Sequence, residues 1–391
     1  MIAPEPFFQE RGTPFSEFYR IKALLDMGHE VDLATYCIGE DIIMKGLSIH
    51  RTAKIPGISN VKVGPSFSKL PLDALLFLKS LRMMFKKNYD LIHTHEEGGL
   101  IGAILKSMFK KPHLYDMHSS LSEQFINFNV SRNRAVVGII RFFEKFILKR
   151  SDSVIVICDR LKDVALALNK RARVTVIENT VNPEFYDYFP KHSEEKIDLS
   201  FRQGKKLALY IGTFEHYQGM DILVNAAKYV KERGAREIVF ACIGGNTQQQ
   251  KLLMQMVGEG GVSDMFYIAG RVSYIEAAKL IDEADILLSP RKEGVNTPLK
   301  IYSYLFAGKP IVATNLLTHT QILNNEVAYL CDANGECFGM TILEVLRDEE
   351  QAKRIGTSAR TYFEREYAYV LYRKRVKRAV DVALSKEEKD G

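Results

Sequence analysis

Two segments of the chain combine a small or polar residue, a threonine and a proline in the order that commonly begins a helix. They are Gly12-Thr13-Pro14 and Asn296-Thr297-Pro298, in which threonine suits the N-cap and proline the first helical position. Unpaired backbone amides and the positive end of the helix dipole make such starts natural binding sites for phosphate groups. Two of them facing one cleft could hold a diphosphate, although the same pattern also serves plain helix capping.

A histidine stands at another position where a ligand could bind. The run 113–117 predicts a buried strand, and His118 follows it directly. Ligands of open α/β sheets bind beyond the carboxyl ends of the strands, so this position favours a functional role. Lone histidines are more often structural: His319 is a weaker candidate, and structural roles are expected for His93, His95, His113 and His216.

Short β-rich runs alternate with helical stretches along the chain, which is typical of parallel α/β proteins. In the first half we predict strands at 29–35, 90–95, 113–117, 153–157 and 173–178. After a polar stretch the pattern restarts, with strands at 207–212, 237–244, 265–269, 285–289 and 310–314. Only three residues precede Pro4, so the first central strand is expected to be short.

The chain of 391 residues is long enough for two domains. We predict an N-terminal Rossmann-like domain over residues 1–187, a polar linker over 188–206 and a C-terminal Rossmann-like domain over 207–365. A helical pattern over about residues 366–386 has no strand left to pair with and is expected to pack back on the first domain. The predicted fold class is α/β with two doubly wound domains.

The composition and the short motifs exclude several classes of protein. A hydrophobic content of 46% and a charged content of 26% are ordinary for a globular protein. The chain has neither an apolar run of about 18 residues nor a basic N-terminal region, so we expect no membrane span, no signal peptide and a cytoplasmic location. Five cysteines without a C-x-x-C pair argue against a disulfide framework and a zinc site. The absence of a G-x-G-x-x-G motif excludes an NAD-dependent oxidoreductase.

Basic residues are concentrated in two segments of the first half. Between Arg51 and Lys87 eight lysines and arginines stand against one acidic residue, Asp73. In the segment 138–150 cations flank an apolar stripe: Arg141, Lys145, Lys149 and Arg150 beside Phe142, Phe143, Phe146 and Ile147. One interpretation is a core-facing amphipathic helix with a basic edge. The other, which the two segments together favour, is a surface that meets anionic lipid. No nucleic-acid motif is present, so nucleic acid is not an expected partner.

One long segment of the second half has a specific pattern. Residues 290–314 read PRKEGVNTPLKIYSYLFAGKPIVAT, and this segment resembles the nucleotide-sugar motif of the retaining family-4 glycosyltransferases of group 1. Further segments match that family in the same order, at 90–95, 115–118, 177–182, 210–214 and 284–290. The resemblance covers nearly the whole chain. It implies the GT-B architecture, in which the second domain holds most of a nucleoside-diphosphate sugar and the first holds the acceptor.

The resemblance also implies roles for individual residues. His118 would face the donor sugar and the reacting centre, Asp116 would orient it, and Glu293 is the candidate for a catalytic glutamate. Taking the helix starts and the resemblance together, the candidate positions for donor binding are Gly12, Thr13, Gly212, Thr213, Gln218, Arg291, Gly294, Asn296, Thr297, Lys300 and Ser303.

Two cations of the family pattern are missing from this chain. Most members have an arginine and a lysine that grip the donor phosphates where this chain has Thr213 and Gln218. A charge-assisted hydrogen bond is worth about 1.5–3 kcal/mol. Loss of both cations without replacement should therefore weaken donor binding severely. We therefore expect Arg291 and Lys300 to replace them.

This chain also departs from the family pattern at the two paired glutamates. The second glutamate, which typically holds the ribose hydroxyls, corresponds to Ser303, whose hydroxyl still offers one weaker contact. In the family the two glutamates lie eight residues apart. The residue eight positions before Ser303 is Val295, so Glu293 serves as the first glutamate only if the loop is two residues longer than usual.

These observations predict a retaining glycosyltransferase that moves a sugar from a nucleoside-diphosphate sugar to a glycan or lipid-linked acceptor in cell-envelope polysaccharide or glycolipid synthesis. No D-x-D pair follows a strand, so we expect no metal, and helix ends and basic side chains must neutralise the leaving group. We expect the enzyme to lie at the inner face of the cell membrane. The alternatives are a catalytically silent protein that binds a sugar nucleotide or glycan, and a sugar-nucleotide epimerase, which would need acidic groups poised for proton abstraction.

Overall fold

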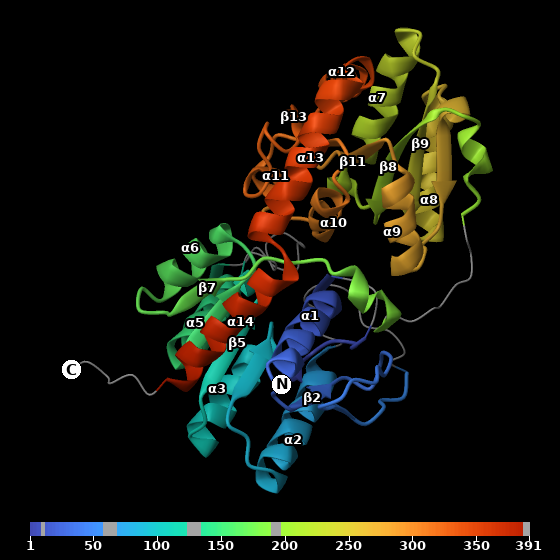
Figure 1. The fold of residues 1–391 in the computed structure, drawn as a ribbon. Helices are drawn as coiled ribbons and strands as arrows, with labels where there is room; N and C mark the ends of the chain where they lie inside the picture. Colours follow the sequence, from blue (N-terminus) through green and yellow to red (C-terminus); the bar gives the residue numbers. More distant parts are fainter. Residues whose placement is uncertain (9–11, 58–68, 123–133, 189–196, 386–391) are drawn as a thin grey trace. The chain divides into compact units, whose positions relative to one another are not determined.

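The computed structural model describes residues 1–8, 12–57, 69–122, 134–188 and 197–385. The chain divides into two compact units, one formed by Met1–Asn179 with Val370–Gly391 and the other by Thr180–Tyr369. In each unit helices pack against a parallel β-sheet (Figure 1). Within the described ranges, no helix combines the length and the apolar character needed to cross a membrane.

The first unit has a seven-stranded parallel sheet in the order β3-β2-β1-β4-β5-β6-β7. Its strands are β1 (Ile2–Ala3), β2 (Val31–Thr35), β3 (Leu47–Arg51), β4 (Ile92–His95), β5 (His113–Met117), β6 (Ser153–Val156) and β7 (Val174–Val176). Its helices are α1 (Gly12–Asp26), α2 (Leu70–Lys86), α3 (Gly98–Phe109), α5 (Arg134–Arg150), α6 (Asp159–Leu168) and α14 (Tyr369–Leu384). The strand order reverses between β1 and β4, and ligands of open α/β sheets bind at such a switch point.

The second unit has a six-stranded parallel sheet in the order β10-β9-β8-β11-β12-β13. Its strands are β8 (Lys206–Gly212), β9 (Ile238–Gly244), β10 (Phe266–Ala269), β11 (Ile286–Ser289), β12 (Ile311–Thr314) and β13 (Tyr329–Cys331). Its helices are α7 (Met220–Glu232), α8 (Thr247–Glu259), α9 (Tyr274–Glu283), α10 (Leu299–Ala307), α11 (Leu317–Thr320), α12 (Gly335–Arg347) and α13 (Glu349–Glu366). Short 3-10 helices occur at η2 (Pro183–Tyr188), η3 (Leu199–Arg202), η4 (His216–Gln218) and η5 (Ser263–Met265). The switch point lies between β8 and β11.

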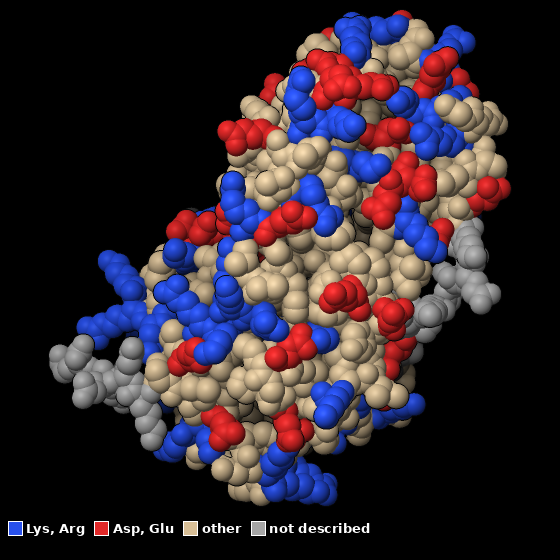
Figure 2. Space-filling view, viewed as in Figure 1, with Lys and Arg blue, Asp and Glu red and all other residues tan. Residues whose placement is uncertain are grey.

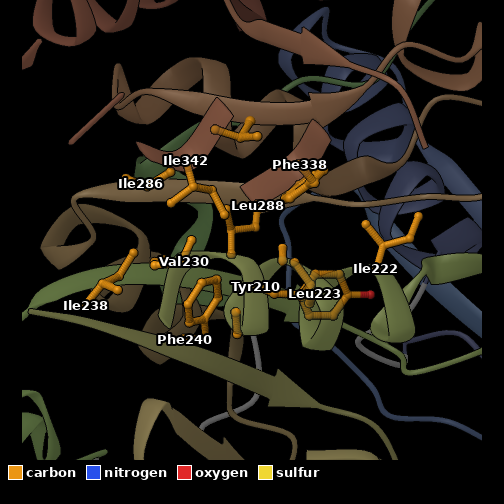
Figure 3. Packing of buried hydrophobic residues seen from close by; sticks show 14 of the residues in the cluster. Tyr210, Ile222, Leu223, Val230, Ile238, Phe240, Ile286, Leu288, Phe338 and Ile342 are labelled. Carbon is orange, nitrogen blue, oxygen red and sulfur yellow. The ribbon is translucent and has the colours of Figure 1, made fainter. Parts of the chain in front are cut away.

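The sheet of the second unit is buried on both faces. Alternate side chains of β8 enter different clusters, with Tyr210 on one face and Leu209 on the other. Figure 3 shows the first face, where residues of the sheet pack with α7 and α12 through Tyr210, Phe240, Leu288, Leu223, Val230, Phe338 and Ile342. Burial on both faces explains the continuous apolar runs from which the strands were predicted. Each fully buried Leu, Ile or Phe side chain contributes about 1.5–3 kcal/mol.

The predicted fold class is confirmed: both sheets are parallel, and all ten predicted strands exist with small differences at their ends. Three further strands were not predicted as such. β3 and β13 are short edge strands, and β1 has two residues that pair with both β2 and β4 at the centre of the sheet. Main-chain pairing on both sides keeps this short strand in place.

The boundaries between the units differ from the predicted ones. The division falls after Asn179, whereas the composition placed the linker at 188–206. A residue before that stretch and one within it pack on the second unit, because Tyr186 stacks edge-on with Tyr274, and Phe201 stacks face-on with Tyr267. The C-terminal helical pattern is also interrupted. α13 ends at Glu366 and α14 begins at Tyr369, and the Thr180 hydroxyl donates to the Tyr367 carbonyl at the break.

Candidate active site

Two loops of the second unit meet at its switch point. One follows β8, from Thr213 to Gly219, and the other follows β11, from Pro290 to Pro298. The backbone N–H of Lys292 donates to the Tyr217 carbonyl at 3.0 Å. A Cβ at Gly219 would lie 1.9 Å from the Pro290 carbonyl oxygen, and its φ of +75° also favours glycine. The close approach of the two loops therefore depends on this glycine.

Arg291 is held inside this loop pair. Its Nη1 donates to the Asn296 carbonyl at 3.0 Å and to Thr318 Oγ1 at 2.7 Å. Its guanidinium carbon lies 5.3 Å from the ring centre of Tyr217. Burial lowers the pKa of the Arg291 guanidinium, and its Nε is buried without a hydrogen-bond partner among the described residues. One donor of a well-positioned cation is thus available for an anion.

Lys300 brings a second cation to the same strand end. Its Nζ lies 3.6 Å from the ring centre of Tyr210, and a Cβ at Gly212 would be 3.1 Å from it. Within the described part of the chain, this nitrogen is buried and makes no hydrogen bond. Burial first, and then the neighbouring Arg291, lower the pKa of the Lys300 amine well below its usual value.

Two neutral groups in these loops are also buried and unpaired. Gln218 Oε1 and Thr297 Oγ1 lack hydrogen-bond partners in the described ranges. The predicted N-cap role of Thr297 is wrong, because α10 begins at Leu299 and its N-cap is Pro298, whose ψ of 137° is extended. Buried polar groups are normally paired, so three unpaired atoms in this pair of loops and a fourth in the first turn of α10 indicate a place for a polar ligand. We call this set the cation cluster: Arg291 Nε, Lys300 Nζ, Gln218 Oε1 and Thr297 Oγ1.

Other predicted residues of the second unit have different surroundings. Thr213 accepts a hydrogen bond from the Tyr210 hydroxyl through its carbonyl, and Gly294, with φ +127°, lies against the Arg291 guanidinium. Glu293 is exposed. Ser303 lines a separate cavity of about 110 Å³ with Tyr186, Tyr274 and Phe306. Neither Glu293 nor Ser303 is among the buried, unpaired groups that form the cation cluster.

His319 has a structural role. Its Nε2 lies 2.8 Å from Ser289 Oγ, and its Nδ1 lies 2.8 Å from the Thr314 carbonyl oxygen. Burial lowers its pKa to about 3, so the ring is neutral. The Thr314 hydroxyl in turn donates to the Arg291 carbonyl at 2.7 Å. The histidine therefore supports the loop that holds Arg291.

The first unit gathers a second set of polar side chains at its own switch point. His118 follows β5 and is buried, with Nε2 3.2 Å from Asp116 Oδ1. Its Nε2 is also 3.2 Å from Nδ1 of His95, the last residue of β4. Arg20 of α1 donates from Nε to Asp116 Oδ2 at 2.7 Å. Asp116 thus contacts the imidazole that the sequence assigned to it.

The charges in this set stabilise one another. Burial alone would raise the pKa of Asp116, but Arg20 and His118 hold that pKa well below its usual value. Burial opposes protonation of His118, yet the Asp116 carboxylate raises the pKa of the ring above its usual value. The His95 pKa is lowered well below normal by burial, so His95 stays neutral beside it. The arrangement favours a protonated His118 paired with an ionised Asp116.

Buried carboxyl groups surround this pair. Glu17 of α1 is fully buried, and burial with the nearby Glu5 raises its pKa well above normal. Glu96 accepts hydrogen bonds from the Ser119 hydroxyl at 2.8 and 3.0 Å, and its pKa is raised to about 8, chiefly by burial. Sequence reasoning missed Arg20, Glu17 and His95 as site residues. The signal was present, because Glu17 and Arg20 lie one helical turn apart in a largely apolar helix.

His93, His95 and Asp116 place ligand atoms within 4.8 Å of one another, as a metal site would. Arg20 already occupies Asp116 Oδ2 at 2.7 Å, and its positive charge opposes a metal cation there. Absence of a catalytic metal stays a prediction.

At the other predicted helix start, α1 begins at Gly12, so Thr13 lies inside the first turn and not at the N-cap. The residue before Gly12 lies outside the described ranges.

Two parallel doubly wound units in one chain, each with polar residues at its switch point, define the GT-B class of fold. Solved structures agree with this fold. Sucrose-phosphate synthase from Thermosynechococcus elongatus has a TM-score of 0.76 and 18% identity, with 97% of this chain and 98% of that chain covered. HepE of Anabaena in complex with UDP-glucose has a TM-score of 0.70 and 15% identity, with the same coverage. WaaG, a glycosyltransferase involved in lipopolysaccharide biosynthesis, has a TM-score of 0.68 and 14% identity over 100% of this chain and 99% of that chain.

Family models match both halves of the chain. Residues 19–185 match Glycosyltransferase Family 4, and residues 191–362 match Glycosyl transferases group 1. An uncharacterized glycosyltransferase of Methanocaldococcus jannaschii is 26% identical over 279 residues, which is 70% of each chain. The chain belongs to the group 1 glycosyltransferases and is a hexosyltransferase-type enzyme.

Proposed function

We propose that this enzyme transfers a sugar from a nucleoside-diphosphate sugar to a saccharide or lipid-linked hydroxyl, with retention of configuration and without a metal. The cation cluster is the observation that carries the donor assignment. Two cations and two neutral polar groups, all with unpaired buried atoms, lie at the switch point where ligands of this fold bind. The solved structures of HepE with UDP and UDP-glucose are consistent with a donor of this class.

In the proposed reaction the two units contribute different groups. Arg291 and Lys300 neutralise the diphosphate as it leaves, in place of the cations missing at Thr213 and Gln218. The leaving phosphate oxygen takes the proton of the acceptor hydroxyl, so no enzyme carboxylate attacks the sugar. His118, held by Asp116, faces the donor sugar. Fixed charges of this kind act strongly because they need no reorganisation during the reaction.

Nucleotide affinity tests the donor assignment. Arg291→Ala and Lys300→Ala should each weaken binding of UDP, GDP or ADP, whichever the parent binds, by roughly ten- to a hundredfold, the worth of a charge-assisted hydrogen bond. Lys292→Ala is the matched control, since Lys292 lies in the same loop but its Nζ pairs with Asp221 at 2.8 Å. If both variants bind like the parent, the cation cluster does not hold the diphosphate.

We also propose that the first unit docks on an anionic membrane through α5. Phe142 and Phe143 are 67% and 41% exposed, whereas a core-facing helix would bury them. Phe142, Lys145 and Lys149 are spaced three and four residues apart and share an outward face, while Ile147 and Leu148 are buried. Exposed aromatic side chains edged by cations suit a lipid surface with negative headgroups.

The other basic segment supports docking less than its composition suggested. Three of its eight cations are paired locally: Arg51 with Asp41, Lys69 with Glu97 and Lys87 with Asp32. Lys62 lies outside the described residues. A further group of Lys and Arg side chains covers the part of the first unit where α14 lies (Figure 2), and the sequence of α14 includes Arg373, Lys374, Arg375, Lys377 and Arg378. The membrane proposal depends on α5, because there exposed aromatic side chains and cations occur together.

The proposed location is the inner face of the cell membrane, where a lipid-linked acceptor would be within reach. WaaG, which shares the fold, is described as acting in lipopolysaccharide biosynthesis, and a role in cell-envelope polysaccharide or glycolipid synthesis is our proposal for this chain. An acceptor assay with lipid-linked and free saccharides decides between membrane-bound and free acceptors.

A further inference from the structure

Lys300 is a buried amine that lacks a partner for its charge. Its Nζ makes no hydrogen bond within the described ranges, and no Asp or Glu in those ranges forms an ion pair with it. Removing an ammonium ion from water costs several kcal/mol even after the protein relaxes. The face of the Tyr210 ring, 3.6 Å from Nζ, offsets only part of that cost, because it carries no net charge. The uncharged amine is therefore the favoured form while the site is empty.

The titratable groups around Lys300 do not change this balance. Tyr210 of β8 and Tyr304 of α10 have pKa values raised by burial, so both are neutral phenols. The Cys242 thiol of β9 has its pKa raised to about 12, again by burial, and is neutral as well. Arg291 is positive and disfavours a second positive charge nearby.

The other neighbours of Arg291 are also without negative charge. His319 is neutral, with its pKa lowered by burial, and Tyr217 of η4 contributes the face of its ring to the guanidinium. Among the described residues, the titratable groups around the amine are thus neutral or positive. A bound anion would supply the missing negative charge.

We propose that Lys300 is a neutral amine in the empty donor site and takes one proton from solvent when the diphosphate of the donor binds. The inference rests on the proposed donor site and adds a proton to its binding reaction. The amine lone pair accepts the proton, the buffer supplies it, and the ammonium ion then pairs with the phosphate oxygens. Because the free site binds fewer protons than the occupied site, affinity falls as pH rises, by about tenfold per pH unit while one proton is taken up.

Calorimetry measures this proton directly. The parent is titrated with UDP-glucose, GDP-mannose and ADP-glucose at pH 7, 7.5 and 8 in Tris and in Hepes, whose ionisation enthalpies differ. Intact nucleotide sugars are used because their phosphodiesters do not titrate in this range, unlike the terminal phosphate of a free nucleoside diphosphate. We expect uptake of about one proton per bound nucleotide sugar, and dissociation constants that rise about tenfold per pH unit.

Two variants assign the proton to Lys300. Lys300→Arg carries a permanent charge and should bind with no proton uptake and a flat pH dependence. Lys300→Met should bind more weakly and also without uptake, and Lys292→Met should behave like the parent. Circular dichroism of each variant checks that the fold is retained, and Lys300→Arg keeps the test decisive if Lys300→Met does not fold.

The outcomes separate the two proposals. Binding by the parent without proton uptake, or uptake that persists in Lys300→Met, overturns the inference and leaves the donor site standing. Failure of all three nucleotide sugars to bind overturns the donor site and the inference with it. Uptake in the parent and in Lys292→Met, but not in the Lys300 variants, supports both.

Discussion

Arg20 Nε lies 2.7 Å from Asp116 Oδ2, and the two side chains are 1% and 0% exposed. The pair joins α1 to the carboxyl end of β5 across 96 residues of sequence. Since Asp116 also contacts His118, the position and charge of the histidine depend on this ion pair.

Breaking the pair should destabilise the first unit strongly. Arg20→Met leaves the Asp116 carboxylate buried without its partner, and we expect a loss of about 3–5 kcal/mol in the free energy of unfolding, measured by urea denaturation. The double variant Arg20→Met with Asp116→Leu should lose less, because no uncompensated charge remains. Lys377→Ala, which breaks an exposed pair with Asp381, should cost under about 1 kcal/mol. Equal losses for Arg20→Met and Lys377→Ala would contradict this.

Asp116→Asn should move the pH profile of the reaction. Asp116 raises the pKa of His118, so removing its charge lets burial lower that pKa. If the protonated ring assists transfer, activity falls as pH rises through the His118 pKa. The descending limb of kcat against pH should therefore shift to lower pH in Asp116→Asn. An unchanged limb, in a variant whose circular dichroism matches the parent, would show that His118 does not act through its charge.

His118→Ala should lower kcat without weakening nucleotide binding. The cation cluster consists of residues of the second unit alone, whereas His118 belongs to the first. Loss of one fixed charge-stabilising group typically costs about a hundred- to a thousandfold in kcat. Steady-state kinetics and calorimetry measure the two quantities. His50→Ala, at a partly exposed position of β3, is the control and should keep both values.

Chelation should leave the transfer rate unchanged. Arg291 and Lys300 are proposed to supply the charge that a divalent cation supplies in metal-dependent transferases. The rate with excess EDTA is compared with the rate in added Mg²⁺. A loss of activity with EDTA that Mg²⁺ restores would refute metal independence.

Liposome sedimentation tests the proposed membrane face. Binding to vesicles with anionic lipid should be strong in 0.1 M salt and weak in 1 M salt, since the Debye length falls from about 10 Å to about 3 Å. Replacing Arg141, Lys145 and Lys149 with Glu, or Phe142 and Phe143 with Ser, should reduce it. The matched control is Leu252→Ser with Met254→Ser, two exposed apolar positions of α8 in the second unit. Equal sedimentation with neutral and anionic vesicles would exclude the proposal.

Much of this protein follows from local sequence patterns. The ten predicted strands appear because a strand of a parallel sheet is buried on both faces and needs a continuous apolar run, as in 207–212 and 285–289. The segment 290–314 indicated the family because the proposed donor-binding loop and helix are contiguous in sequence. His118 was likewise recognisable, since it directly follows the strand β5.

Other features were decided only when distant segments packed together. The segment 138–150 is amphipathic under either interpretation, and only the burial of Ile147 and Leu148 shows that Phe142 faces outward. Glu293 and Ser303 were assigned from a family motif, yet in the structure Glu293 is exposed and Ser303 lines a separate cavity with Tyr186. The pairing of Arg20 with Asp116 and the position of Lys300 over Tyr210 depend on side chains that meet across 90 residues or more of chain. No local pattern determines which charges will be buried together, because that depends on the surfaces that fold against them.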